Sequence, residues 1–272
     1  MPEFDRSTPV TVTVHGHRGT VEITAEDRTT VVADVAPLDS SDASRSAAEA
    51  ATVTLEGDTL AVRTPEVNGG RWRRSANLAI TVRVPTGSSL AVRTDSADVH
   101  ARGSFATAEV RTASGDLRIE DVTGDARTDT ASGDVTIGRV GGALWMGSAS
   151  GDLRVGDVSG DVSLNTASGD IALQHAGASV GVDTASGDVE IGVVHRGRTG
   201  IRSASGDVRI GVAAGTAVWL DLNTLSGSTR SDLAMAGEGT DPAPPTGAAL
   251  ELRVQTLSGD IHVRRAAVPA AA

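Results

Sequence analysis

Aspartates recur at a fixed spacing between residues 98 and 260 and are the first residues that could do chemistry. The segments TASGDLRI, TASGDVTI and TASGDVEI each place an aspartate after a Ser-Gly pair. Most of these aspartates are 18 residues apart. The series consists of Asp98, Asp116, Asp134, Asp152, Asp170, Asp188, Asp207 and Asp260. A column of carboxylates at such a spacing could bind a row of cations.

The same column also has a structural interpretation. Carboxylates stacked about 5 Å apart repel each other by about 1 kcal/mol even in water, so each needs a partner. Calcium-binding nonapeptide repeats carry a GGxGxD pattern, whereas most aspartates here follow a single glycine. We therefore favour a turn ladder in which each carboxylate accepts backbone N–H bonds at the corner. This interpretation requires no metal ion and no cofactor.

Hydroxyl side chains form a second column beside the first. It contains the pairs Thr112/Ser114, Thr130/Ser132, Thr166/Ser168 and Thr184/Ser186. Regular Thr-x-Thr columns on a flat solenoid face can bind ice. Here the hydroxyls directly precede the Gly-Asp turn, so we expect them to satisfy backbone groups at the corner.

Two further places could contact a partner. The segment GGRWRR contains Arg71, Trp72, Arg73 and Arg74, the one concentrated basic cluster of the sequence. It could grip a phosphate or an acidic partner, although a solvated loop anchored by its Trp is the more ordinary interpretation. Trp145 falls on an outward position of the repeat, which indicates a contact surface or a slip of the register.

Catalysis has little support in the sequence. The six histidines share no register with the repeat and have no metal-ligand spacing. We predict no serine-nucleophile elbow. Because Asp and Ser recur in every repeat, as structure demands and a single active site does not, we predict that the protein is not an enzyme.

The elements that position these residues are short strands. A weaker copy of the motif lies halfway through several repeats, as at Asp125 and Asp161, so the basic unit is about nine residues. Apolar residues alternate with polar ones after each turn, as in half-buried strands. The inward pairs include Leu117/Ile119, Leu153/Val155 and Ile171/Leu173. Two strands and two corners then make one coil of 18 residues, which favours a two-sided coil over a triangular one.

The resulting fold class is all-β, a parallel β-solenoid with an N-terminal antiparallel β cap. Aromatic residues are only 2% of the chain, which suits a thin aliphatic interior. We assign residues 1–95 to the cap, with a hairpin at Gly57-Asp58 and a short helix capped by Ser41 or Ser44. Residues 96–265 form the solenoid, with a Gly/Pro-rich loop near 234–247, and residues 266–272 a disordered tail.

Charge limits the partners. The net charge is −11, and phosphate backbones are bound through Lys and Arg, so we expect no nucleic acid. Anionic membranes are disfavoured for the same reason, and no apolar stretch is long enough to insert into a membrane. The N-terminus shows no basic segment followed by an apolar run. We therefore expect a cytoplasmic protein.

The sequence resembles a bacterial β-strand-repeat family called domain of unknown function 4097, whose members carry the label adhesin. The resemblance rests on MPEFDRSTPVTVTV, the serial SGD motif, AVWLDLNTLSGSTRSDL and LELRVQTLSGDIHVRR. The sequence looks especially like the short actinobacterial members that lack a signal peptide. The family implies a β-solenoid and supplies no catalytic residues. Some relatives are associated with envelope-stress regulation.

Together these observations favour a non-enzymatic scaffold that presents repetitive faces to a protein partner, in stress or regulatory signalling. An adhesin-like surface protein and a cation- or ligand-binding solenoid are the alternatives. If the last segment, LSGDIHVRR, closes the free end of the solenoid with Arg264 and Arg265 as charged guards, we expect a monomer or an end-to-end dimer through that coil.

Overall fold

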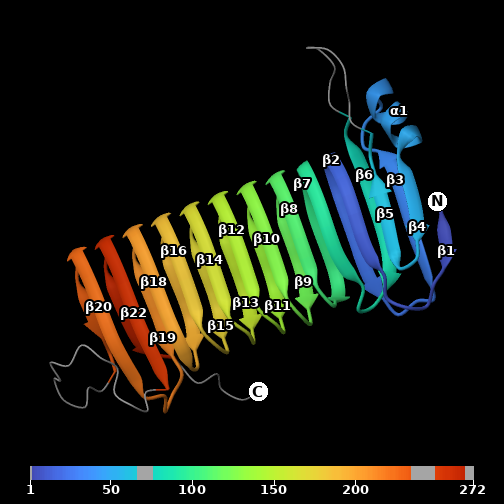
Figure 1. The fold of residues 1–272 in the computed structure, drawn as a ribbon. Coiled ribbons are helices and arrows are strands. Elements are labelled where there is room, and N and C mark those ends of the chain that lie inside the picture. The colour runs from blue at the N-terminus through green and yellow to red at the C-terminus, as the bar shows by residue number, and fades with distance from the viewer. Residues whose placement is uncertain (1, 66–75, 234–248, 267–272) are drawn as a thin grey trace. The chain divides into compact units, whose positions relative to one another are not determined.

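The computed structural model describes residues 2–65, 76–233 and 249–266 (Figure 1). The chain divides into two compact units, Met1–Val140 (unit 1) and Gly141–Ala272 (unit 2). Both units are built as parallel β-solenoids, with two strands in each coil of the repeat. Arg71 to Arg74, the expected loop at 234–247 and residues 267–272 of the expected tail lie outside the described residues.

The coils of unit 1 begin with two long strands, β2 (Thr11–Glu26) and β7 (Ser89–Phe105). They pair in parallel from Thr11↔Ser89 to Thr24↔Arg102. Parallel pairing therefore starts well before residue 96, where the aspartate repeat begins. β2 has no SGD motif, but its alternating Val and Ile residues are buried as in a repeat strand.

The remaining coils of unit 1 follow the 18-residue register. β8 and β10 pair in parallel on one side, and β9 and β11 pair on the other. The bounds are β8 (Ala108–Ser114), β9 (Leu117–Val122), β10 (Ala126–Ser132) and β11 (Val135–Val140).

An antiparallel cap completes unit 1, as predicted. β3 pairs antiparallel with β1 and β6, and β4 pairs antiparallel with β5 across the predicted turn at Gly57-Asp58. β5 and β6 also pair in parallel with β2, which joins the cap to the first coil. The bounds are β1 (Glu3–Asp5), β3 (Thr30–Pro37), β4 (Thr52–Glu56), β5 (Thr59–Arg63) and β6 (Leu78–Pro85).

The short predicted helix is also present, as α1 (Asp42–Ala50). Ser41 is its N-cap, because the Ser41 hydroxyl accepts the backbone N–H of Ser44 at 3.1 Å. Ala47 of this helix is buried against Ala76 and Leu78.

Unit 2 alternates strands between two parallel ladders. One ladder contains β12 (Leu144–Ser150), β14 (Val162–Ser168), β16 (Val180–Ser186), β18 (Gly197–Ser205), β22 (Leu250–Ser258) and β20 (Val218–Ser226). The other contains β13 (Leu153–Val158), β15 (Ile171–Ala176), β17 (Val189–Val194), β19 (Val208–Val212), β23 (Ile261–Arg265) and β21 (Thr229–Ser231). The inward residues predicted from the alternation are buried, for example Leu153, Leu173 and Ile191 at 0–1% exposure.

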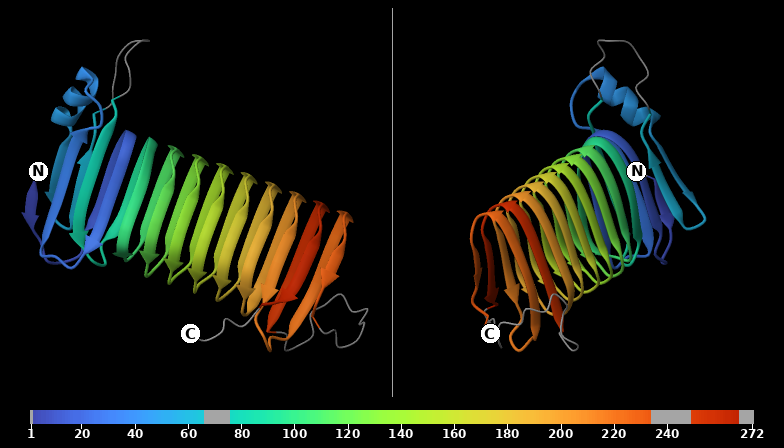
Figure 2. Two further views of the ribbon diagram at one scale, coloured as in Figure 1. Left: turned by 180° about the vertical axis from the view of Figure 1, so that it is seen from behind. Right: turned by 60° about the vertical axis from the view of Figure 1, so that its left-hand side comes forward.

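The order of the last coils differs from their order in the sequence. β22, drawn red in Figure 2, pairs in parallel with β18 on one side and with β20 on the other. The expectation that LSGDIHVRR forms the free end is therefore wrong, and β20 with β21 forms the last described coil. Arg264 and Arg265 do not guard that end, because β23 lies between β19 and β21.

The side chains at the corner explain this order. Asp207 accepts the N–H of Asp260, and Asp260 accepts the N–H of Ser228. The coil of Ser228 has Gly-Ser where the repeat has Gly-Asp. It therefore has no carboxylate to offer to a further coil, which suits it to the end of the stack.

Candidate binding face

The aspartate column lies at one corner of the coils in each unit. In unit 1, Asp98 accepts the backbone N–H of Asp116, and Asp116 accepts that of Asp134, at 2.9 and 3.1 Å. In unit 2 the same bond recurs at 2.8–3.0 Å. Its acceptors there are Asp152, Asp170, Asp188 and Asp207.

These bonds connect one coil to the next, whereas an Asx turn would close within a single corner. The partner of these stacked carboxylates is thus a backbone N–H, which occupies the Oδ1 atom. At the end of the column, the backbone N–H of Ser228 and then its side chain lower the pKa of Asp260. Within the described ranges, no three His, Cys, Asp or Glu side chains are grouped so that they could hold a metal ion.

The threonines of the hydroxyl column face the interior, whereas its serines are exposed. Thr112, Thr130, Thr166 and Thr184 are at most 9% exposed. Each hydroxyl donates to the carbonyl of the serine two residues later, at 3.0–3.3 Å. These threonines satisfy backbone groups at the corner and cannot form an exposed ice-binding face.

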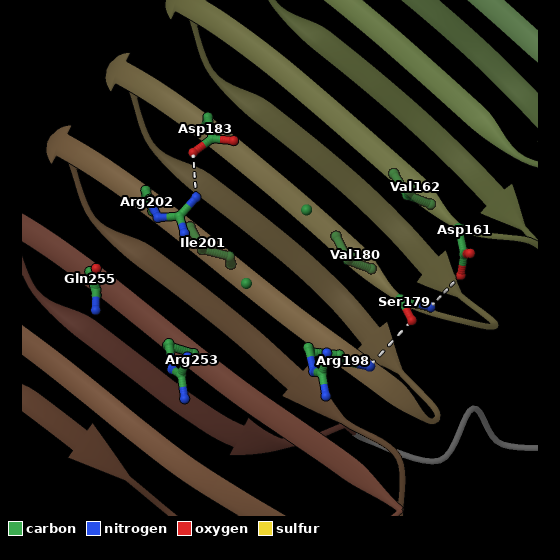
Figure 3. Close-up of a pocket in the computed structure, with 12 residues that line it drawn as sticks. Asp161, Val162, Ser179, Val180, Asp183, Arg198, Ile201, Arg202, Arg253 and Gln255 are labelled. Carbon is green, nitrogen blue, oxygen red and sulfur yellow. Dashed lines mark hydrogen bonds and ion pairs between the residues drawn. The ribbon is translucent and has the colours of Figure 1, made fainter.

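Unit 2 has a hollow of about 440 Å³ on its outer surface, over β14, β16, β18 and β22 (Figure 3). The strand register explains its position. Along one outward row, Trp145, Ser163 and Gly181 are partners in successive strands, followed by Gly200 and Arg253. Gly181 and Gly200 are among its lining residues and, having no side chains, leave a gap in this row.

The two glycines are not required by the backbone or by packing. Neither has a positive φ. A Cβ at Gly200 would meet nothing within 4 Å, and one at Gly181 would meet only a carbonyl at 3.8 Å. Glycine weakens a strand interior and often marks a place where a ligand or another backbone approaches closely. We therefore take this hollow as the candidate binding site.

Charged side chains surround the hollow. Figure 3 shows Asp183 and Arg202 along one side, Asp161, Ser179 and Arg198 along another, and Arg253 with Gln255 beyond them. The three arginines form ion pairs of 2.9–3.5 Å: Arg198 with Glu251, Arg202 with Asp183, and Arg253 with Asp221. Arg253 also lies over Trp219, 5.5 Å from the ring centroid.

The arginines remain accessible despite these pairs. The side chains of Arg198 and Arg202 are 77% and 76% exposed, and that of Arg253 is 47% exposed. Exposed ion pairs contribute little to stability because water screens them. Each arginine can therefore turn toward an acidic group of a partner at a small free-energy cost.

The comparison with family models agrees with the fold. The Toastrack DUF4097 model matches residues 11–264. The chain belongs to the Toastrack DUF4097 family. Among curated proteins, none matches this Toastrack chain.

Two solved structures are similar to this Toastrack chain over nearly its whole length. A "putative lipid binding protein" from Parabacteroides distasonis is 15% identical, with 96% of this chain and 95% of that chain covered and a TM-score of 0.42. A "putative cell adhesion protein" from Clostridium sporogenes is 10% identical, with 96% and 94% covered and a TM-score of 0.22.

Trp145 is the one predicted contact residue of this Toastrack chain that the described structure includes. It is half-buried on the outward row, in line with the glycines of the hollow. A methyl group built on Gly147 would lie 2.7 Å from its Cη2 atom, so the indole ring covers Gly147.

Gly181, Gly200 and the arginines around them were not predicted from the sequence. These residues are not part of the SGD motif. The two glycines carry one sequence signal, because each stands where the alternation predicts an outward side chain. The comparison of this position between repeats could have found them.

The spacing Gly-x-Ser-x-Gly, which is typical of a serine-nucleophile elbow, occurs at residues 177–181. Ser179 lies just before β16, and the chain continues from it into that parallel strand. A nucleophile elbow leads instead from a strand into a helix. Its hydroxyl accepts the N–H of Arg198 at 3.3 Å, and its N–H donates to Asp161. Ser179 therefore serves the solenoid corner in this structure.

Proposed function

We propose that the protein is a non-enzymatic scaffold that holds a protein partner on the outer face of β14, β16, β18 and β22. The observation that carries the proposal is the pair of glycines in the hollow. Each glycine in a strand costs about 0.5–1 kcal/mol relative to Ala, and neither Gly181 nor Gly200 is needed for the backbone or for packing. A partner that enters the hollow would explain why both positions are glycine.

The charges around the hollow support a protein partner over a nucleic acid. Every arginine here has a carboxylate neighbour, and the chain as a whole carries −11. Repeated phosphates would be repelled by Asp161, Asp183, Asp221 and Glu251. A protein segment can instead place one bulky side chain over the glycines and one acidic group beside an arginine, and arginine is enriched in such interfaces.

Capture of the partner from native lysate tests the proposal. The parent chain is compared with a double variant, Gly181→Val with Gly200→Val, which fills the hollow with β-branched side chains. Ala172→Val is the matched control, because Ala172 is an outward position on β15 of the other ladder. A protein that the parent and the control capture, and the double variant does not, supports the proposal. Equal capture by all three contradicts it.

The location of the scaffold belongs to the same proposal. Among the described residues, no helix is long and apolar enough to cross a membrane. We propose a cytoplasmic scaffold, and the alternative is an adhesin-like surface protein. Fractionation of native cells separates them, since the first predicts the protein in the cytoplasmic fraction and the second predicts it at the surface.

A further inference from the structure

The last described coil of unit 2 has an open edge on β20. This strand pairs with β22 on one side, and no strand within the described residues pairs with its other side. Its inward residues Val218, Leu220 and Leu222 are only half-buried. Their partners in β22, which are Leu250, Leu252 and Val254, are 0% exposed. The interior of the solenoid is therefore incompletely covered at β20.

The edge carries none of the features that usually prevent edge pairing. Natural sheets protect their edges with short strands, lysine, proline, bulges or inward-pointing charges. β20 is nine residues long, and its sequence VWLDLNTLS contains no Lys and no Pro. Its one charge, Asp221, points outward and is paired with Arg253. In unit 1, by contrast, the antiparallel strands β1 and β4 are short, with three and five residues.

Exposed leucines lie on the last two described coils of unit 2. Leu225 of β20 is 82% exposed and Leu257 of β22 is 60% exposed. The register places them next to each other, between the pairs Thr224↔Thr256 and Ser226↔Ser258. The preceding repeats of unit 2 have Ala at this position, for example Ala167 and Ala185. Large apolar side chains thus replace alanine next to the open edge.

We propose that β20 pairs antiparallel with β20 of a second copy of this chain, around a two-fold axis at Leu222. The backbone supports this centre. Ala217 directs its carbonyl toward β22, where it accepts the N–H of Leu250 at 3.1 Å. Because successive residues of a strand direct their backbone groups to opposite sides, Leu220, Leu222 and Thr224 direct theirs to the open edge. Leu222 of each copy can then exchange two hydrogen bonds with Leu222 of the other.

The side chains favour this register over the one centred at Asp221. With the axis at Leu222, the outward residue Trp219 of each copy faces Leu225 of the other copy. Asp221 of each copy likewise faces Asn223 of the other. With the axis at Asp221, two aspartates would face each other, and like charges directly opposite are unfavourable. The Leu222 register is self-complementary, and it closes the assembly as a dimer.

Sedimentation over a range of concentrations tests the dimer. The parent is expected to have twice the chain mass of 27.5 kDa. Leu222→Pro removes an N–H that points away from β22, so the variant keeps its internal ladder and should be monomeric at concentrations at least tenfold above those that dimerise the parent. A parent that is monomeric throughout, or a Leu222→Pro variant that still dimerises, overturns the proposal.

Single cysteines test the register, since the chain contains none of its own. Cα atoms of a hydrogen-bonded antiparallel pair are about 5.5 Å apart, within the range that a disulfide spans. Leu222→Cys is therefore expected to form a cross-linked dimer under mild oxidation. Leu220→Cys is the matched control, because the two copies of residue 220 would be about 13 Å apart along the strands. Equal cross-linking of both variants overturns the register. Thermal unfolding of each variant shows that it is folded.

Discussion

Glycine occupies two kinds of position in unit 2, and the comparison between them separates the fold from the proposed function. Gly169 at the corner has φ of +120°, and a Cβ on it would lie 2.2 Å from the carbonyl oxygen of Gly151. Gly200 on the outer face has neither constraint. The same residue type is therefore demanded by the solenoid at one position and unexplained by it at the other. The second kind is the better guide to what the protein binds.

The largest expected effect is at the corner. Gly169→Val is expected to lower the free energy of unfolding by about 3 kcal/mol or more, because it adds a β-branched residue at positive φ and a clash with the neighbouring coil. Ser163→Val, on an outward position of β14, should change it by less than about 0.5 kcal/mol. Denaturant unfolding measures both. Similar midpoints for the two variants would contradict the assigned corner.

The aspartate beside that glycine should have a smaller effect. Asp170→Ala removes the acceptor of the Asp188 N–H, a bond of 2.9 Å, and is expected to cost about 1 kcal/mol. Asp170→Asn keeps an oxygen at the same place and reduces repulsion along the column, so it should cost less than Asp170→Ala. An Asn variant as unstable as the Ala variant would show that the charge, and not the hydrogen bond, matters.

On the outer face, a Gly→Val substitution should raise the free energy of unfolding, whereas at the corner it should lower it. Gly200→Val is expected to raise the free energy of unfolding by about 0.5–1 kcal/mol, because valine is favoured in strands and glycine is not. Urea unfolding of this variant and of the parent provides the comparison. A marked loss of stability would mean that the fold itself requires Gly200, and would remove the reason for placing a partner there.

Calcium should have the smallest effect. Each column carboxylate with a bond described above already accepts a backbone N–H, so the thermal midpoint in millimolar calcium should lie within about 2 °C of that in a chelator. Magnesium is the control for a general effect of divalent cations. A larger shift with calcium alone would revive the cation-ladder interpretation.

The coils themselves were predictable because the 18-residue repeat and the alternation of apolar residues are local properties of the sequence. They identified Leu153 and Leu173 as inward residues. The entry of β2 into the parallel ladder was not predictable from the motif, since β2 pairs with β7 through apolar alternation alone. β22 lies between β18 and β20, where the N–H of Asp260 donates to Asp207 and the carboxylate of Asp260 accepts the N–H of Ser228. Chain order alone would place β20 next to β18.

The candidate site was harder to predict for a related reason. The aspartates recur in register and drew attention first, yet their carboxylates hold neighbouring coils together. The hollow depends on Gly181 and Gly200 becoming neighbours across β16 and β18. It also depends on Arg253, which β22 brings next to β18 despite its distance along the chain.

The position of the partner tests the central claim most directly. A photo-crosslinking amino acid at Gln255, which lines the hollow, is compared with the same amino acid at Ala172 on the other ladder. Both variants are irradiated in native lysate, and the cross-linked products are separated by mass. We predict a product with one protein partner from Gln255 and none from Ala172. The same product from Ala172, or none from Gln255 while the partner is still captured, would contradict the claim that the partner binds over the hollow.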